Sequence, residues 1–165
     1  PIDSCSIGHT MRDKFILPKE LESRLRGEPR PMVFTNGVFD ILHRGHVTYL
    51  AQAKSLGAFL IVALNTDSSV KRLGKGVDRP INKTEDRIAV IEALESVDAV
   101  TSFEEDTPLN LIMRIKPDIL VKGGDWAENE IVGSTEAKQW GGSTVSIPFQ
   151  FDTSTSNTIE RIREG

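Results

Sequence analysis

The residues AFLIVALN, at positions 58–65, form an almost unbroken apolar run. A strand that has one face in water alternates apolar and polar residues, whereas a strand covered on both faces is apolar along its whole length. Strands of the second kind occur in parallel sheets whose two faces are covered by helices. The run therefore predicts a buried strand of a parallel sheet, which favours the α/β class.

The segments around this run alternate between strand-like and helix-like patterns. Short apolar runs predict strands at 31–36, 58–65, 99–103, 118–123 and 141–149. Helical spacing of apolar residues, with Gly and Pro boundaries, predicts helices at 46–56, 84–94, 107–115, 134–140 and 155–163. The connections are long enough for parallel crossovers. We therefore expect an α/β fold with a doubly wound five-stranded parallel sheet, in which ligands bind at the carboxyl ends of the strands.

Two further segments lie outside this alternation. Residues 15–26 predict a helix that packs on the outside of the domain, and the polar, basic residues 66–83 predict a loop with room for one helical turn. The length of 165 residues allows one domain. We expect an N-terminal tail and helix over 1–29 and the α/β domain over 30–165.

The charge and cysteine content argue against several classes of protein. Lys and Arg number 20 and Asp and Glu 24, so the net charge is −4 and no large basic field is available to hold a nucleic-acid polymer. The single cysteine, Cys5, forms neither an internal disulfide nor a zinc cluster. No apolar run approaches the roughly 20 residues of a membrane helix, and the N-terminus lacks the apolar stretch of a signal peptide. We expect a cytoplasmic protein without a nucleic-acid or membrane partner.

The loop after the first expected strand, residues 35–46 (TNGVFDILHRGH), places two histidines at the start of a helix. The N-terminus of a helix carries unsatisfied N–H groups and a partial positive charge, so it attracts phosphate. Gly45, between His43 and His46, lets a ligand approach the backbone closely. Histidines are more often ordinary polar residues than catalysts, but only His9 lies elsewhere in the chain. We expect both loop histidines to donate hydrogen bonds to phosphate oxygens.

This loop resembles the HxGH signature of the cytidylyltransferase-like nucleotidyltransferase superfamily. Segments 65–73, 79–82, 122–126 and 154–157 narrow the resemblance to the branch that forms ADP-heptose. The similarity runs from about residue 30 to 163. It implies a Rossmann-like fold and the transfer of AMP from ATP, with Mg²⁺, to D-glycero-β-D-manno-heptose 1-phosphate for surface glycan synthesis, in lipopolysaccharide or capsule. It also implies a homo-oligomer. Many members carry a fused sugar kinase, for which this chain is too short, so we expect a stand-alone transferase.

The resemblance, together with position at the strand ends, assigns roles to individual residues. The catalytic residues would be His43 and His46, which bind the triphosphate and stabilise the transition state. The nucleotide-binding residues would be Thr35, Asn36, Gly37, Phe39, Gly45, Lys122, Gly123, Asp125, Ser154, Thr155 and Ser156. The residues that bind the sugar phosphate or neutralise phosphate charge would be Asp40, Asp67, Lys71, Lys75 and Arg79. No residue is assigned to a metal.

Several of these residues have an ordinary structural interpretation that the sequence leaves open. Phe39 fits the core as well as a nucleotide wall, and Asp40 fits a loop carboxylate that orients backbone N–H groups. Lys71, Lys75 and Arg79 fit a solvated loop, and Trp126 fits a shield over the edge of the core. The Ser/Thr cluster at 154–156 fits an N-cap of the last helix, a role that is compatible with phosphate binding.

Two other functions remain open beside adenylyl transfer. The first is cytidylyl transfer to a polyol or amino-alcohol phosphate, and the second is nucleotide binding without turnover. The closing segment FDTSTS, residues 151–156, lacks the Arg-Thr-Glu-Gly-Ile-Ser run of related cytidylyltransferases, which argues against CTP. The intact HxGH loop and the cationic segment after it argue against a binding module that has lost its activity.

Overall fold

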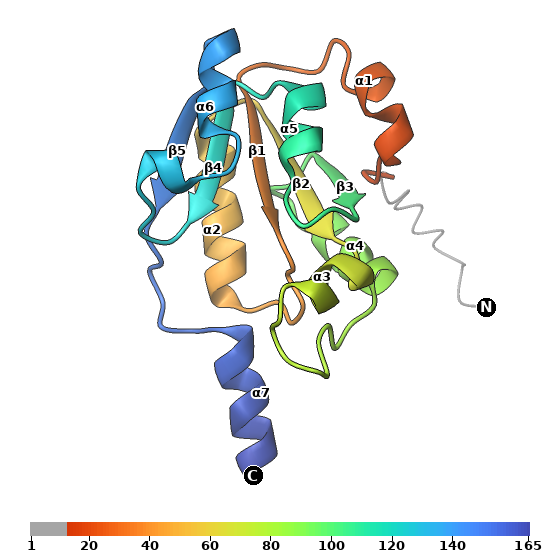
Figure 1. Ribbon diagram of the computed structural model, residues 1–165, viewed down its shortest axis with the longest axis vertical. Coiled ribbons are helices and arrows are strands. Elements are labelled where there is room, and N and C mark those ends of the chain that lie inside the picture. The colour runs from red at the N-terminus through yellow and green to blue at the C-terminus, as the bar shows by residue number, and fades with distance from the viewer. Residues whose placement is uncertain (1–12) are drawn as a thin grey trace, which may run out of the picture.

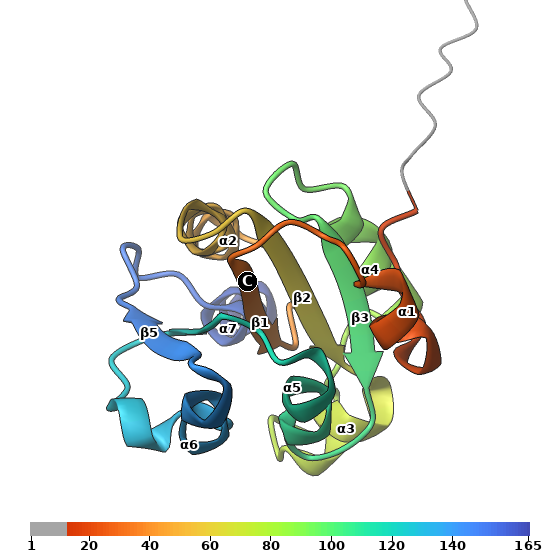
Figure 2. The same ribbon diagram turned by 90° about the horizontal axis from the view of Figure 1, so that it is seen from above.

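The computed structural model describes residues 13–165 and contains a single parallel sheet with strand order β3-β2-β1-β4-β5 (Figures 1 and 2). The strands are β1 (Met32–Gly37), β2 (Phe59–Asn65), β3 (Ala99–Phe103), β4 (Ile119–Gly123) and β5 (Ser143–Ile147). Every neighbouring pair is parallel. All seven residues of β2 are buried, because helices cover both faces of the sheet. The predicted doubly wound five-stranded sheet is confirmed.

Alternate residues of the strands build two separate cores, one on each face of the sheet. One face packs against α1 (Leu21–Arg24), α5 (Leu109–Ile115) and α6 (Ser134–Ala137). The other face packs against α2 (Arg44–Ser55) and α4 (Thr84–Glu92). Figure 2 shows α2 and α5 on opposite sides of the sheet. Within β1, for example, Phe34 belongs to the first core and Val33 to the second, as the two-residue period of a strand requires.

The strand order reverses beside β1, and this reversal positions the site. The chain passes from β1 to β2 and β3 in one direction and then returns to place β4 on the other side of β1. Connections therefore leave the carboxyl ends of β1 and β4 in opposite directions and open a crevice between them. The first of these ends is Gly37 and the second is Gly123.

The N-terminal segment differs from the predicted helix over 15–26. Phe15 forms a parallel bridge with Val100 of β3, and helical structure begins only with the 3₁₀ turn η1 (Pro18–Glu20), which leads into α1. Backbone hydrogen bonds with Val100 hold this segment at the sheet edge. Leu21 is fully buried, so the segment contributes to the core instead of lying on the outside. The division of the chain at residue 29 stays a prediction.

Residues 66–83, predicted as a loop with room for one helical turn, contain the six-residue helix α3 (Asp67–Arg72). Thr66 caps this helix, because its side chain accepts a hydrogen bond from the backbone N–H of Ser69. Val70 is the one large apolar residue of α3 that is buried, so the helix has too little apolar periodicity for the sequence to reveal it. Residues 73–83 remain non-helical, as predicted.

The other predicted elements are present with small shifts at their ends. Helix α2 begins at Arg44 and α5 at Leu109, and the expected helix at 134–140 is α6 followed by the 3₁₀ turn η3 (Lys138–Trp140). A short 3₁₀ turn, η2 (Glu128–Glu130), precedes it, and α7 (Thr155–Glu164) closes the chain. Among residues 13–165 no helix is long and apolar enough to cross a bilayer. Cys5 and His9 lie outside the described residues.

Candidate active site

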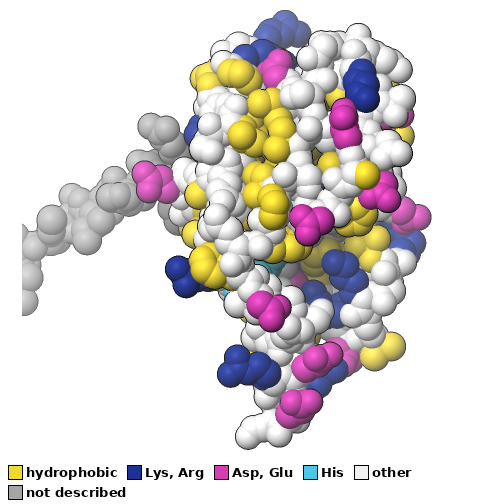
Figure 3. Space-filling model, turned by 90° about the vertical axis from the view of Figure 1, so that its left-hand side faces the viewer, with side chains coloured by type: hydrophobic (Ala, Val, Ile, Leu, Met, Phe, Trp, Pro, Cys, Tyr) yellow, Lys and Arg dark blue, Asp and Glu magenta, His cyan; other side chains and the backbone are white. Residues whose placement is uncertain are grey.

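A cleft of about 800 Å³ opens over the carboxyl ends of β1 and β4. Its main walls come from five segments: the end of β1, the histidine loop (residues 38–46), the cation loop (residues 73–83), the end of β4, and residues 149–157, which lead into α7. In Figure 3 a histidine and several Lys or Arg side chains are visible in the hollow between the body and the projecting lower part. The cleft lies where the reversal of strand order places ligands in open α/β sheets.

His43 is the N-cap of α2 and lies in the cleft wall. Its Nδ1 accepts a hydrogen bond of 3.1 Å from the backbone N–H of Gly45, so a neutral ring carries its proton on Nε2. The ring stacks on that of His46, with 3.8 Å between centroids and 23° between planes. The structure thus places the two predicted catalytic histidines side by side at the start of a helix.

His46 is more enclosed than His43 and has an unused hydrogen-bonding atom. Its Nδ1 is buried and has no partner among the described residues. The edge of Phe39 packs against the ring at 5.2 Å between centroids. Burial first, and then the nearby His43 and Lys75, lower the pKa of His46 to about 4, so the ring is neutral at pH 7. A buried ring nitrogen without a partner is uncommon in folded proteins and marks His46 as a functional candidate.

The backbone of the histidine loop is strained at Phe39. This residue has a φ of 49°, a left-handed value that residues other than Gly rarely adopt. Its ring folds back over Gly37, where an added Cβ would lie 2.9 Å from Phe39 Cε2. Phe39 lines the cleft and also belongs to the core on the α2 face, so it meets both interpretations that the sequence left open. Strain of this kind gathers at functional sites.

The lowered pKa of His46 predicts a pH-dependent loss of stability. The unfolded chain takes up a proton near pH 6.5, whereas the folded protein does so only near pH 4. Between these values the unfolded state binds more protons, so the free energy of unfolding falls as the pH falls. We expect His46→Gln to lose less stability than the wild type between about pH 6.5 and about pH 4 in urea unfolding. Equal losses in the two proteins would contradict this. His43→Gln is the control, because the pKa of His43 is lowered less strongly than that of His46.

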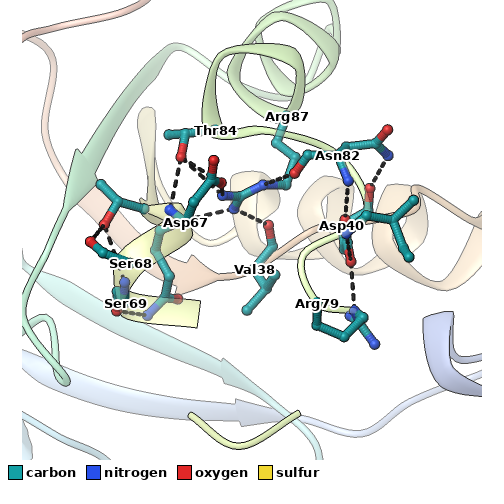
Figure 4. Close-up of polar contacts among 12 residues, drawn as sticks. Val38, Asp40, Asp67, Ser68, Ser69, Arg79, Asn82, Thr84 and Arg87 are labelled. Carbon is teal, nitrogen blue, oxygen red and sulfur yellow. Dashed lines mark hydrogen bonds and ion pairs between the residues drawn. The ribbon is translucent and has the colours of Figure 1, made fainter. Parts of the chain in front are cut away.

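Asp40 lies in the histidine loop, but its carboxylate is turned toward the cation loop (Figure 4). The residue is buried, and Oδ2 accepts hydrogen bonds from Arg79 Nε at 2.6 Å and from the backbone N–H of Ile81 at 2.9 Å. Oδ1 accepts from the backbone N–H of Asn82 at 2.8 Å. Both oxygens are therefore engaged. These contacts favour the loop-orienting interpretation over direct binding of substrate or metal.

Three cationic side chains line the cleft: Lys75, Arg79 and Lys122. Enclosure by the cleft walls lowers the pKa of Lys75, and the charge of Arg79 lowers it further. Enclosure and the charge of Lys75 likewise lower the pKa of Lys122. These cations repel one another, and an anion between them would relieve that repulsion. The cleft is suited to a polyphosphate.

The cluster Ser154-Thr155-Ser156 brings the start of a second helix to the cleft. Ser154 is the N-cap of α7, and its Oγ accepts a hydrogen bond of 3.1 Å from the backbone N–H of Asn157. Thr155 Oγ1 donates to the carbonyl oxygen of Ile41, which ties α7 to the histidine loop. Both α2 and α7 thus direct the positive ends of their dipoles at the same space.

Four predicted site residues lie outside the cleft lining: Thr35, Asp67, Lys71 and Asp125. Thr35 is fully buried within β1, where its hydroxyl contacts that of Tyr49. Asp67 forms an ion pair with Arg87 at 2.8 Å. Lys71 is exposed on α3, and Asp125 is exposed beyond the end of β4. The remaining predicted residues all line the cleft.

The cleft also contains aromatic residues to which the sequence assigned no binding role. Trp126 is 46% exposed, and its Nε1 donates to the carbonyl of Gly123 at 3.0 Å, so it lines the cleft and is not a cover of the core edge. Phe149 and Phe151 also line the cleft. Phe149 follows the last strand and is 68% exposed. An aromatic residue next to a predicted strand end was the available signal, but such a residue is usually core.

Comparison with known proteins agrees with this geometry. A family model described as cytidylyltransferase-like matches residues 34–161. The D-beta-D-heptose 1-phosphate adenylyltransferase of Bordetella bronchiseptica is 60% identical over 137 residues, which are 83% of this chain and 85% of that protein. The bifunctional protein HldE of Salmonella arizonae is 56% identical over 141 residues. That match covers 86% of this chain but only 29% of the bifunctional relative.

Solved structures give the same result for the fold. The lipopolysaccharide core biosynthesis protein from Thermoplasma volcanium has a TM-score of 0.61 at 32% identity, covering 73% of this chain and 98% of that one. Pantoate-beta-alanine ligase from Francisella tularensis has a TM-score of 0.60 at 16% identity, covering 88% and 73%, and shares the fold alone. The resemblance drawn from the HxGH loop is confirmed. Because the family model spans both the histidine loop and the start of α7, this chain belongs to the cytidylyltransferase-like family.

Proposed function

We propose that this chain transfers AMP from ATP to D-glycero-β-D-manno-heptose 1-phosphate, giving ADP-heptose and pyrophosphate for the synthesis of a surface glycan, lipopolysaccharide or capsule. One observation carries the proposal. Two stacked histidines at the start of α2 face a cleft with three cations, in a chain that is 60% identical to a protein named D-beta-D-heptose 1-phosphate adenylyltransferase. The geometry of the site supports nucleotidyl transfer, and the name of the relative supports the choice of base and sugar.

The reaction exchanges one phosphate bond for another. An oxygen of the sugar 1-phosphate attacks the α-phosphorus of ATP, the bond from that phosphorus to the bridging oxygen breaks, and pyrophosphate leaves with the electron pair. The ionised phosphate needs no general base, and no covalent intermediate is required. Catalysis then consists of positioning and of stabilising charge on the phosphoryl oxygens. Neutral His43 and His46 would donate ring N–H groups to these oxygens in the transition state.

The other cleft residues would hold the two anionic substrates together. Lys75, Arg79 and Lys122 would neutralise the crowded phosphates, and the N-termini of α2 and α7 would add backbone N–H groups. The end of β4, with Gly123, would lie against the nucleoside together with Asn36, Gly37 and Phe39. Because they lie outside the cleft lining, the four residues Thr35, Asp67, Lys71 and Asp125 receive no direct ligand role in this proposal.

Mg²⁺ is proposed as a companion of the substrate. Within residues 13–165 no three His, Cys, Asp or Glu side chains are grouped as metal ligands, and both oxygens of Asp40 already hold the cation loop. We therefore assign no protein residue to Mg²⁺ in this proposal. Mg²⁺ commonly binds through substrate phosphates and keeps several waters. We propose that it enters as MgATP.

Homo-oligomerisation and a cytoplasmic location complete the proposal. The C-terminal helix α7 projects from the body (Figure 1), and its Ile162 is 72% exposed. Hydrophobic side chains also gather down the face shown in Figure 3. Surfaces of this kind often pair with another chain. The cytoplasm would supply ATP to the site.

A substrate panel tests the proposed function. The protein is incubated with ATP or CTP and with heptose 1-phosphate, a polyol phosphate or an amino-alcohol phosphate, and pyrophosphate and the product mass are measured. We expect pyrophosphate and ADP-heptose from ATP with heptose 1-phosphate only, and the α and β anomers compared separately identify the form used. Release with CTP in place of ATP would favour cytidylyl transfer. No release with any pair would indicate a binding module and overturn the proposal.

A further inference from the structure

The guanidinium of Arg87, in α4, is buried at the carboxyl ends of two central strands (Figure 4). The residue is 1% exposed and is the largest fully buried side chain among residues 13–165. It donates hydrogen bonds to the oxygens Asn82 O (3.0 Å), Val38 O (2.9 Å), Asn65 O (2.7 Å), Asp67 Oδ1 (2.8 Å) and Thr84 Oγ1 (3.2 Å). A buried charge is costly, and it is retained where it is paired and fully hydrogen-bonded.

The partners of Arg87 belong to three segments that form or support the cleft. Val38 opens the histidine loop directly after β1, and Asn65 is the last residue of β2. Asn82 lies near the end of the cation loop. A planar guanidinium can bridge several carbonyl oxygens in one fixed arrangement, whereas the compact ammonium of a lysine cannot. One side chain therefore binds all three segments.

Asn82 extends this contact into the site. Its backbone N–H donates to Asp40 Oδ1 at 2.8 Å, and its Nδ2 donates to the carbonyl oxygen of Asp40 at 2.5 Å. Asp40 in turn holds Arg79 by its Nε, and within residues 13–165 the Arg79 guanidinium makes no other hydrogen bond. The rest of this guanidinium is thus available in the cleft. Asp40 lies three positions before His43 in the histidine loop.

We propose that Arg87 is a positioning residue for catalysis. Through Asn82 and Asp40 it holds the histidine loop and the cation loop in the one arrangement in which the histidines and Arg79 meet the same triphosphate. Arg87 itself does not line the cleft, so it acts without touching the substrate. The inference rests on the proposed function, because positioning has consequences only for a site that catalyses. The competing explanation is that Arg87 stabilises the fold and does nothing more.

Two variants separate these explanations, each with a matched control. Arg87→Lys keeps the charge and removes the bridging geometry. Its control is Arg72→Lys, because exposed Arg72 also binds a carboxylate, that of Asp106, and a backbone carbonyl, that of Glu104. Asn82→Ala removes the side-chain contact to Asp40, and Asn110→Ala is its control, because exposed Asn110 donates to Glu105. Both controls lie outside the cleft.

We expect kcat to fall about 100-fold in Arg87→Lys, because a displacement of about 1 Å at a catalytic site lowers the rate by about that factor. In Asn82→Ala, which removes one side-chain contact, we expect kcat to fall about 10-fold. The dissociation constant of ATP should change by less than about threefold, since the helix N-termini and Lys122 remain in place. Activity is measured at a temperature at which circular dichroism shows each variant to be folded. The two controls should keep the wild-type kcat.

Amide hydrogen exchange at Ile81 and Asn82 supplies a readout that does not depend on substrate. Both amides donate to Asp40, so exchange at these positions should accelerate in Arg87→Lys and stay unchanged in Arg72→Lys. Wild-type exchange and wild-type kcat in folded variants would overturn the inference, as would a kcat loss equal to the unfolded fraction. If Arg87→Lys does not fold, Asn82→Ala decides. If the wild type turns over no substrate pair, the proposed function fails, and the exchange rates alone then decide whether Arg87 holds the loops.

Discussion

Replacing His46 by alanine is expected to lower kcat by about 100- to 1,000-fold, the cost of removing one preorganised donor from a developing oxyanion. The KM values for ATP and sugar phosphate should change by less than about fivefold, because the donor contributes mainly in the transition state. His46 is suited to this role because it lines the cleft and because burial keeps its ring neutral at pH 7, so that one ring nitrogen carries an N–H. Steady-state release of pyrophosphate measures both constants.

The adjacent histidine and a conservative variant sharpen this test. His43→Ala should also lower kcat, and it should in addition loosen α2, since His43 caps that helix through the N–H of Gly45. His46→Gln keeps an N–H donor of similar reach and should recover part of the activity that His46→Ala loses. Unchanged turnover in both alanine variants would remove the catalytic assignment. A large rise in KM at constant kcat would show that the histidines only bind substrate.

The fold could be predicted from the sequence wherever one local pattern determined it. The run at 58–65 is apolar because both faces of β2 are covered, so its composition alone indicated a central strand. Phe15 and α3 were harder to predict. Phe15 pairs with Val100, which is far away in the sequence, and α3 buries only Ser69 and Val70, so neither segment shows the periodicity of its structure.

The same distinction between local and distant contacts decides which site residues could be predicted. His43, Gly45 and His46 occupy one helix start, and a local motif was enough to find them. For Asp40 the resemblance favoured a substrate role over a loop-orienting one. Its partners, Arg79, Ile81 and Asn82, lie about 40 residues further along the chain, so only the fold reveals them. Arg87 appeared only as an ordinary helical residue. Its burial depends on carbonyl oxygens that the end of β2 and two loops bring together.

Asp40→Ala is expected to lower the free energy of unfolding by about 3–5 kcal/mol, the usual cost of removing one partner from a buried ion pair. The side chain of Asp40 is fully buried, and that of its partner Arg79 is 9% exposed. Truncation would leave the Arg79 guanidinium and the backbone N–H groups of Ile81 and Asn82 without an acceptor. Urea unfolding at neutral pH measures the loss, and Asp40→Asn should lose less because its amide oxygen can still accept one of these bonds.

Asp118→Ala is the matched control for this prediction. Asp118 accepts hydrogen bonds from Arg30 Nη1 at 2.8 Å and from the backbone N–H of Met32 at 2.6 Å, so it joins an arginine to a backbone amide as Asp40 does. Its side chain, however, is 38% exposed and that of Arg30 is 51% exposed. Water can replace the lost acceptor there, so we expect a loss of only about 1 kcal/mol. Equal losses at the two positions would mean that burial does not strengthen the Asp40 contacts, and Asp40 would then have no special part in holding the cation loop.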